Sequence, residues 1–158
     1  MTDVSETCKI PENNATEIIK NLWLGNIDSS VDDYFLKKHN IKHVFRILPI
    51  DNLKFCDYVN YYNYPIEDLS CCDLNMQTFF EDICKLIHQK IQNNEATLIH
   101  CKRGHHRSGC VVACYLMTYY KLNYFEAIRY INLKRPCAMR RNTCMLYSLY
   151  DYYLGHFN

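Results

Sequence analysis

The sequence predicts an α/β domain in which a mostly parallel central sheet is flanked by helices. Short β-prone segments alternate with helical patterns along the chain, which is typical of this class. One segment, residues 96–100, is a short apolar run of the kind that forms a strand buried on both faces. Of the 158 residues, 49% are hydrophobic and 22% are charged, as in an ordinary globular protein. We therefore expect a single domain over residues 16–158, preceded by a flexible arm over residues 1–15.

Four further strands are predicted in the first half of the domain. Residues 17–19 and 22–25 are two short β-prone segments joined by a turn. Residues 43–48 and 58–64 form a second pair. Pro65 is expected to stop the last of these strands, because proline lacks the amide that a sheet requires.

One helix is expected between these two pairs of strands. Ser29 or Ser30 is a suitable N-cap, and the helical pattern ends near Asn40. The apolar side of this helix is formed by Val31, Tyr34 and Phe35.

Four helices are predicted in the second half. Asp73 is a plausible N-cap for a long helix. Its apolar residues recur at helical spacing: Phe79, Phe80, Ile83, Leu86, Ile87 and Ile91. A second helix begins near Arg107, and Asn123 with Glu126 forms the capping-box start of a third. A final helix contains Met145, Leu146, Leu149 and Tyr152.

The charge balance restricts the possible partners. The formal net charge is only +1, so no global field would hold the chain on DNA or on an anionic membrane. We expect neither DNA nor a membrane as a partner, and any anion must bind at a local cluster.

No apolar stretch has the length of a signal peptide or a membrane helix, which favours a cytoplasmic protein. Asn, Ile, Lys and Tyr are abundant, as in proteins of some large DNA viruses or protists with A/T-rich genomes.

The ten cysteines are expected to be reduced thiols, because no export signal accompanies them. The closest approaches to a zinc motif are Cys71 with Cys72 and Cys110 with Cys114, and neither has the spacing of zinc ligands. We therefore expect no structural metal.

A nucleophile motif follows the apolar segment at residues 96–100. Cys101 comes directly after this strand, and Arg107 begins a helix six residues later, so loop amides and the helix dipole converge on one point. Gly104 and Gly109 supply the conformational freedom that such an anion-binding loop requires. This environment lowers a cysteine pKa and leaves a reactive thiolate at neutral pH. Arg107 can hold two phosphate oxygens, and Ser108 can donate a hydrogen bond to the sulfur.

Phosphoryl transfer to a cysteine also needs an acid that protonates the departing oxygen and later a base that activates water. Asp68 lies on the loop after a predicted strand, where it could reach over the phosphate. Asp73 is the competing carboxylate, although its place before a helical pattern suits a cap better. The choice of Asp68 depends on position alone.

A basic rim surrounds the predicted nucleophile. Lys102, Arg103, His105 and His106 raise the local positive charge, and with the Gly104 backbone they are the expected substrate-binding residues. Such a rim favours polyanions or doubly phosphorylated peptides. The alternative for Lys102 and Arg103 is that their side chains point away into solvent.

The segment His-Cys-x-x-Gly-x-x-Arg-Ser-Gly, residues 100–109, resembles the signature of the dual-specificity members of the protein tyrosine phosphatase superfamily. Residues 22–26, 35–41 and 115–117 also resemble segments of that family. The resemblance implies a phosphorylated Cys101 intermediate, phosphate binding by Arg107, general acid catalysis by Asp68 and no metal or cofactor. Family members usually have fewer residues between this aspartate and the next helix.

Two kinds of relative suggest two kinds of substrate. The loop Cys101-Lys102-Arg103-Gly104 resembles that of plant and fungal enzymes that act on inositol pyrophosphates. The surrounding chain is more similar to compact protein-directed enzymes, including those of poxviruses. We expect a phosphorylated protein substrate, with phosphotyrosine and phosphoserine or phosphothreonine as targets. The alternatives are a polyphosphorylated small molecule, a phosphoinositide, an RNA 5′-triphosphate, or a binding module without turnover. The sequence does not indicate an oligomeric state.

Four further expectations concern the surroundings of the loop. His100 is expected to shape the loop by hydrogen bonding. Asn142 either braces the loop, as the family resemblance suggests, or caps the last helix. Cys71 or Cys72 could form a reversible disulfide with Cys101. Three cysteines are expected in the core: Cys84, Cys110 and Cys114.

Overall fold

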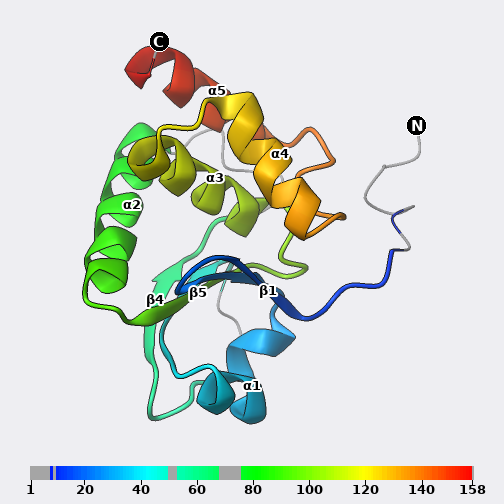
Figure 1. The fold of residues 1–158 in the computed structure, drawn as a ribbon, viewed down its shortest axis with the longest axis vertical. Coiled ribbons are helices and arrows are strands. Elements are labelled where there is room, and N and C mark those ends of the chain that lie inside the picture. The colour runs from blue at the N-terminus through cyan, green and yellow to red at the C-terminus, as the bar shows by residue number, and fades with distance from the viewer. Residues whose placement is uncertain (1–7, 9, 50–52, 68–75, 158) are drawn as a thin grey trace.

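The computed structural model describes residues 8, 10–49, 53–67 and 76–157. Its centre is a five-stranded sheet with the strand order β1-β2-β5-β3-β4. Figure 1 shows the helices α2 to α5 on one face of this sheet and α1 on the other. The predicted α/β class with helices flanking a central sheet is confirmed.

The sheet is mostly parallel, as predicted. The strands β1 (Ala15–Ile19) and β2 (Leu22–Gly25) pair in the antiparallel direction. All other pairs are parallel: β2 with β5 (Ala96–His100), β5 with β3 (Ile41–Ile47), and β3 with β4 (Asn60–Tyr64). The carboxyl ends of these four parallel strands therefore lie at one edge, where α/β proteins bind their ligands.

Strand β5 has the most enclosed position in the sheet. It has a neighbour on each side, and all five of its residues are buried. Because helices cover both faces, its side chains can be apolar on both sides, which explains the continuous apolar run in the sequence. The strand ends at His100, so the next residue emerges at the ligand-binding edge.

The first helical region differs from the prediction at its start. A short 3-10 turn, Asp28–Val31, precedes α1 (Asp33–Lys38), and the N-cap of α1 is Asp32. The Asp32 carboxylate accepts a hydrogen bond from the Phe35 amide at 3.1 Å. The predicted cap at Ser29 or Ser30 is wrong, because both hydroxyls donate instead to carbonyls three residues earlier, at 2.7 Å each.

The buried face of α1 also differs in part. Leu36 is the residue that α1 buries, at 1% exposure, whereas Tyr34 is 73% exposed. Phe35 packs edge-on against Trp23 with ring centroids 5.2 Å apart. The late start of α1 changes which positions face the sheet, and this removes Tyr34 from the apolar side.

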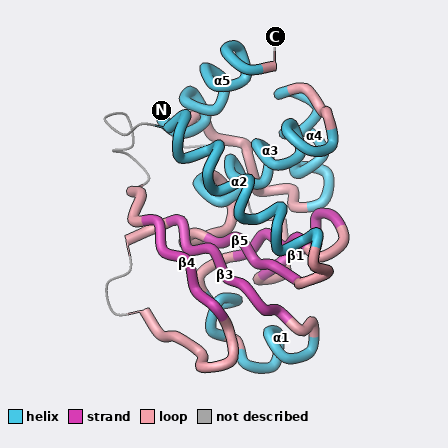
Figure 2. Tube along the Cα trace, turned by 90° about the vertical axis from the view of Figure 1, so that its left-hand side faces the viewer, coloured by secondary structure: helices cyan, strands magenta, loops and turns pink. Residues whose placement is uncertain are grey.

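The four larger helices form one layer over the opposite face of the sheet (Figure 2). They are α2 (Met76–Gln92), α3 (Arg107–Tyr120), α4 (Tyr124–Lys134) and α5 (Cys144–His156). Residues 108–117 of α3 are all buried, so α3 lies at the centre of this layer.

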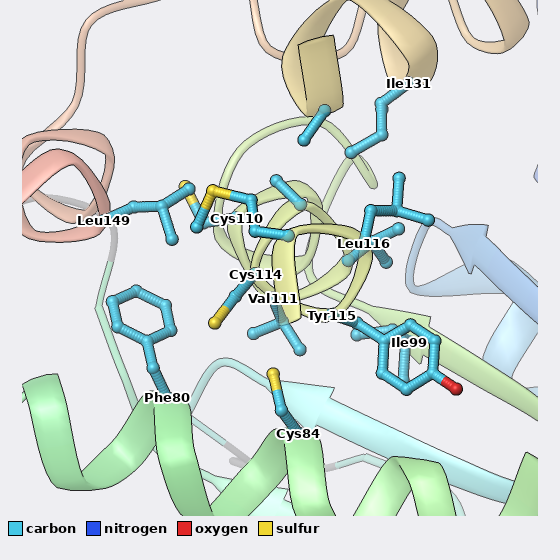
Figure 3. Packing of buried hydrophobic residues seen from close by; sticks show 14 of the residues in the cluster. Phe80, Cys84, Ile99, Cys110, Val111, Cys114, Tyr115, Leu116, Ile131 and Leu149 are labelled. Carbon is cyan, nitrogen blue, oxygen red and sulfur yellow. The ribbon is translucent and has the colours of Figure 1, made fainter. Parts of the chain in front are cut away.

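Packing around α3 forms the main core. Figure 3 shows α3 side chains between Phe80 and Cys84 of α2, Ile131 of α4 and Leu149 of α5. The three cysteines predicted for the core, Cys84, Cys110 and Cys114, have exposures of 0 to 2%.

The helix caps of α4 and α5 were predicted with different success. The capping box of Asn123 and Glu126 is present, with reciprocal hydrogen bonds of 2.8 and 2.9 Å. The N-cap of α5 is Thr143, whose hydroxyl accepts from the Leu146 amide at 3.1 Å. The alternative that Asn142 is this cap is therefore wrong by one position. The predicted cap of α2, Asp73, lies outside the described residues.

Cys8 and Cys137 form a disulfide, with their Cα atoms 5.9 Å apart. The expectation of reduced thiols is therefore wrong for this pair, and also for Cys144, which is disulfide-bonded as well. Of the segment 1–15, for which we expected a flexible arm, the structure describes Cys8 and residues 10–15. Within it, the Asn14 carbonyl accepts a hydrogen bond from the Asn26 amide at 2.8 Å. Among the helices of the described residues, none has the length and apolar character needed to cross a bilayer.

Candidate active site

The loop between β5 and α3, residues 101–107, is here called the phosphate loop. Its carbonyl groups are held by the surrounding protein: Lys102 O accepts from the Ile27 amide at 3.0 Å, and His105 O from the Met139 amide at 3.1 Å. A peptide's carbonyl and amide point in opposite directions. Carbonyls turned outward therefore leave amides directed at the interior of the loop, where they form an anion-binding site.

Gly104 is required by the shape of this loop. Its φ is +72°, a conformation that side-chain-bearing residues rarely adopt. A Cβ atom here would lie 2.4 Å from the Gly25 backbone carbonyl. The phosphate loop thus packs directly against the end of β2, which only glycine permits.

The sulfur of Cys101 lies at the base of the phosphate loop, and the residue is 3% exposed. The Ser108 hydroxyl is 3.1 Å from the sulfur. Burial by itself raises a thiol pKa. Hydrogen bonds from the Ser108 hydroxyl, the Ser108 amide and the His105 amide, together with the Arg107 charge, outweigh burial and lower the pKa of Cys101 below its ordinary value.

His100 supports the loop from the end of β5. It is fully buried, and its Nδ1 lies 3.0 Å from the Cys101 carbonyl oxygen. Burial, with the nearby charges of Arg46 and Arg107, lowers the pKa of His100 to about 4. The ring is therefore neutral at pH 7, and Nδ1 donates to the carbonyl, which confirms the expected hydrogen-bonding role.

Arg107 is the first residue of α3 and reaches the segment that follows β4. Its guanidinium donates to the Ile66 carbonyl at 2.9 Å. This bond places residue 66 beside the phosphate loop. The predicted acid, Asp68, and its competitor, Asp73, lie outside the described residues, so their roles stay predictions. The same holds for the predicted pairing of Cys71 or Cys72 with Cys101.

A cavity of about 270 Å³ opens above the sulfur. It is lined by Cys101, Lys102, Arg103, His105, His106, Arg107 and Arg141. The structure thus brings the predicted residues of the phosphate loop around one space, except Gly104, which is not among the lining residues. Lys102 and Arg103 are exposed at its rim, whereas His105 and His106 are buried in its wall.

Arg141 was missed as a lining residue. It lies in the irregular segment between α4 and α5, and its amide donates to His106 Nε2 at 3.0 Å. The sequence shows a basic pair, Arg140 and Arg141, but no local pattern indicates that this segment folds back to the phosphate loop.

Arg135, at the end of α4, was also missed. Its side chain is fully buried and donates to two carbonyls of the phosphate loop, Gly104 O at 2.9 Å and Arg103 O at 3.2 Å. Arg135 therefore braces the phosphate loop, whereas the bracing role suggested for Asn142 stays a prediction. A buried arginine is unusual in itself, but burial cannot be read from a single position of the sequence.

Comparisons with known proteins agree with this geometry. The sequence model of the family described as "Dual specificity phosphatase, catalytic domain" matches residues 22–154. Dual specificity protein phosphatase 22-B of Danio rerio is 30% identical over 130 residues, which is 80% of this chain and 67% of the relative. Putative tyrosine phosphatase 123R of Invertebrate iridescent virus 6 is 28% identical over 125 residues, covering 76% of this chain and 79% of the relative. The crystal structure of human DUSP28 has a TM-score of 0.81 at 19% identity, covering 94% of this chain and 98% of that chain, which shows a common fold.

Proposed function

Because this chain belongs to the dual-specificity phosphatase family and is a cysteine-dependent protein phosphatase, we propose that it hydrolyses phosphotyrosine and phosphoserine or phosphothreonine in proteins through a phosphorylated Cys101. The observation that supports this most is the environment of the sulfur. A thiol whose pKa is lowered lies beneath a basic cavity and beside an arginine that begins a helix.

In the first step the Cys101 thiolate attacks the phosphorus atom, and the bond between phosphorus and the leaving oxygen breaks. Arg107 and the amides of the phosphate loop bind the equatorial oxygens, where charge accumulates in the transition state. Asp68 is the proposed acid that protonates the leaving oxygen, which releases the dephosphorylated side chain.

In the second step water attacks the phosphorus of the phosphocysteine, and the bond between sulfur and phosphorus breaks. Asp68, now ionised, accepts a proton from this water. The sulfur departs as a thiolate. The Ser108 hydroxyl lies 3.1 Å from this sulfur. It donates a hydrogen bond to the sulfur and so stabilises the negative charge of the departing thiolate.

The proposed nucleophile is tested by replacing one atom. In Cys101→Ser the oxygen is a weak nucleophile with a high pKa, so release of phosphate from a generic aryl phosphate is expected to fall to background. Turnover at the wild-type rate in this variant would refute the mechanism. A wild-type protein that binds phosphopeptide and releases no phosphate would instead support a binding module.

A second substrate class is favoured by the charge of the cavity rim. Lys102 and Arg103 are exposed there, and Arg107 and Arg141 bring the lining to four cations. Several cations around one cavity suit a substrate with more than one phosphate. The kcat/KM values for a phosphotyrosine peptide, a phosphothreonine peptide, an inositol pyrophosphate and a 5′-triphosphate RNA distinguish the two classes. Turnover of the RNA or the inositol compound alone would exclude the protein-directed function.

The cytoplasm is the proposed compartment. Glutathione and thioredoxin keep most thiols reduced there, so the Cys8–Cys137 disulfide is expected to open in that environment. Thiol trapping in intact cells followed by fractionation tests both points. Recovery of the protein from a secreted fraction would contradict the proposed compartment.

A further inference from the structure

Glu12 lies before β1, outside the residues matched by the family model, and its carboxylate contacts the phosphate loop. Its Oε1 is 2.5 Å from His105 Nε2 and 3.4 Å from the guanidinium of Arg135. The Glu12 side chain is 19% exposed, His105 11%, and Arg135 is fully buried. One carboxylate, largely withdrawn from water, thus joins two basic side chains next to the phosphate loop.

His105 connects this carboxylate to the nucleophile. Its backbone amide is one of the groups that hydrogen bond to the Cys101 sulfur, and its carbonyl accepts from the Met139 amide at 3.1 Å. The His105 Nδ1 atom is buried without a hydrogen-bond partner in the described part of the chain. The bond from Nε2 to Glu12 therefore sets the orientation of the ring.

Arg135 holds the other side of the same peptide unit. The Gly104 carbonyl, which accepts from Arg135 Nε at 2.9 Å, belongs to the peptide whose amide is that of His105. When this carbonyl is pulled outward, the amide is turned inward to the sulfur. Arg135 is itself fixed by Glu12, by the Asn13 carbonyl at 2.7 Å and by the Thr16 hydroxyl at 3.1 Å.

The segment that carries Glu12 is attached on both sides. Before it, Cys8 is linked by the disulfide to Cys137, two residues before Met139. After it, Asn14 pairs with Asn26 through their backbones at 2.8 Å and their side chains at 2.9 Å. The hydrogen bonds between Asn14 and Asn26 do not depend on the disulfide, so they hold Glu12 near the phosphate loop even when the disulfide is reduced.

We propose that Glu12 is a positioning residue for this phosphatase: through His105 and Arg135 it fixes the peptide between Gly104 and His105, so that the His105 amide stays directed at the Cys101 sulfur. The inference rests on the proposed function, in which this sulfur is the nucleophile. It assigns to the segment before the family domain a part in the reaction.

The test compares Glu12→Ala with Glu12→Gln in the full chain. The rate of Cys101 alkylation by iodoacetamide is followed as a function of pH, by mass spectrometry of the peptide that contains Cys101. Glu12→Ala removes the acceptor of the His105 ring, and the alkylation midpoint is expected to rise by about one pH unit, the scale of one hydrogen bond to a charged group. Glu12→Gln keeps an oxygen acceptor, so its midpoint is expected to stay near that of the wild type.

Glu17→Ala is the matched control, since Glu17 is an exposed carboxylate five residues away whose hydrogen-bond partner is the Asn21 amide. It is expected to leave the midpoint unchanged. A purely structural role for Glu12 would lower the thermal midpoint of unfolding without moving the alkylation midpoint of the folded protein.

Two results would overturn the proposal. One is an alanine variant with the wild-type alkylation midpoint. The other is a glutamine variant that shifts as far as the alanine variant, because charge and not the hydrogen bond would then act. Alkylation needs no turnover, so failure of the proposed function, seen as a wild-type protein that releases no phosphate, is a separate outcome.

Discussion

The hydroxyl of Ser108 lies 3.1 Å from the sulfur of Cys101, across the junction between the phosphate loop and α3. Ser108 is fully buried, so this hydroxyl is withheld from water and directed at the sulfur. The same contact serves two states of the proposed reaction: the free thiolate before attack and the thiolate that departs in the second step.

Ser108→Ala is expected to slow hydrolysis of the phosphocysteine more than its formation. A hydrogen bond to a charged atom contributes about 1.5–3 kcal/mol, so the second step should slow roughly 10- to 100-fold. Rapid-quench kinetics with an aryl phosphate should then show a burst of phenol followed by slow turnover. The control is Ser148→Ala in α5. The Ser148 hydroxyl donates to the Cys144 carbonyl at 3.2 Å and has no part in the proposed chemistry. Equal loss of rate in both steps would contradict this role for Ser108.

Cys101 is expected to react with iodoacetamide at a lower pH than an ordinary thiol. The lowered pKa leaves the thiolate populated, so the rate should reach half its plateau below the value of about 8.5 that is typical of free cysteine. Cys84 provides an internal comparison, because complete burial raises the pKa of its thiol. Peptide mass spectrometry should find Cys101 modified at pH 7 while Cys84 stays unmodified. The reverse order would contradict the proposed nucleophile.

Asp68→Asn is expected to lower kcat roughly 10²- to 10⁴-fold, the usual contribution of a general acid. The loss should be largest for alkyl phosphates such as phosphothreonine, whose leaving oxygen needs a proton most. Asp73→Asn is the matched control, since this carboxylate was the other candidate in the sequence. If Asp73→Asn loses activity and Asp68→Asn does not, the two assignments must be exchanged.

His100 is expected to make the folded state less stable as the pH falls. Its pKa is about 4 in the folded protein and 6.5 in the reference state, so between these values the unfolded chain binds the extra proton. Stability should therefore decrease from pH 6.5 downward. His100→Asn keeps a donor near the Nδ1 position and cannot titrate, so its urea midpoint should change less between pH 7 and pH 5 than that of the wild type. Identical changes in both proteins would contradict the burial of a neutral His100.

Gly104→Ala is expected to destabilise the fold by about 1–3 kcal/mol, because the new Cβ would meet the Gly25 backbone 2.4 Å away. The left-handed φ of +72° adds strain of its own. Gly155→Ala is the control: no atom lies within 4 Å of its Cβ position, and alanine favours the helix α5. Urea unfolding should show opposite shifts in the two variants. An unchanged midpoint in Gly104→Ala would mean that the loop does not pack as described.

The elements that were predicted well have local causes. Strand β5 and the start of α3 follow from a continuous apolar run, two glycines and an arginine within 14 residues, 96–109. The cap of α1 was missed because serine and aspartate are both good caps. The choice between them depends on which groups the serine hydroxyls bond to. In the folded turn both hydroxyls donate to backbone carbonyls and do not cap the helix.

The parts of the site that were missed depend on contacts between distant segments. Arg135 reaches the Asn13 carbonyl over 122 residues, Glu12 reaches His105 over 93, and Cys8 reaches Cys137 over 129. Such pairs leave no periodic or spaced signal in one sequence, because each partner is ordinary in its own surroundings. The position of Cys101 and Arg107 around one loop could be predicted from local sequence, whereas the contacts that Glu12, Arg135 and Cys137 make around this loop could not.

The central position of β5 has a consequence for how activity is lost. A strand at the edge of a sheet can fray by itself. Strand β5 has a neighbouring strand on each side and helices over both faces, so it is expected to open only when the whole domain unfolds. The amide hydrogens of Leu98 and Ile99 should therefore be among the slowest to exchange with deuterium. On heating, the protein should keep its full specific activity until the cooperative transition and then lose catalysis and structure together.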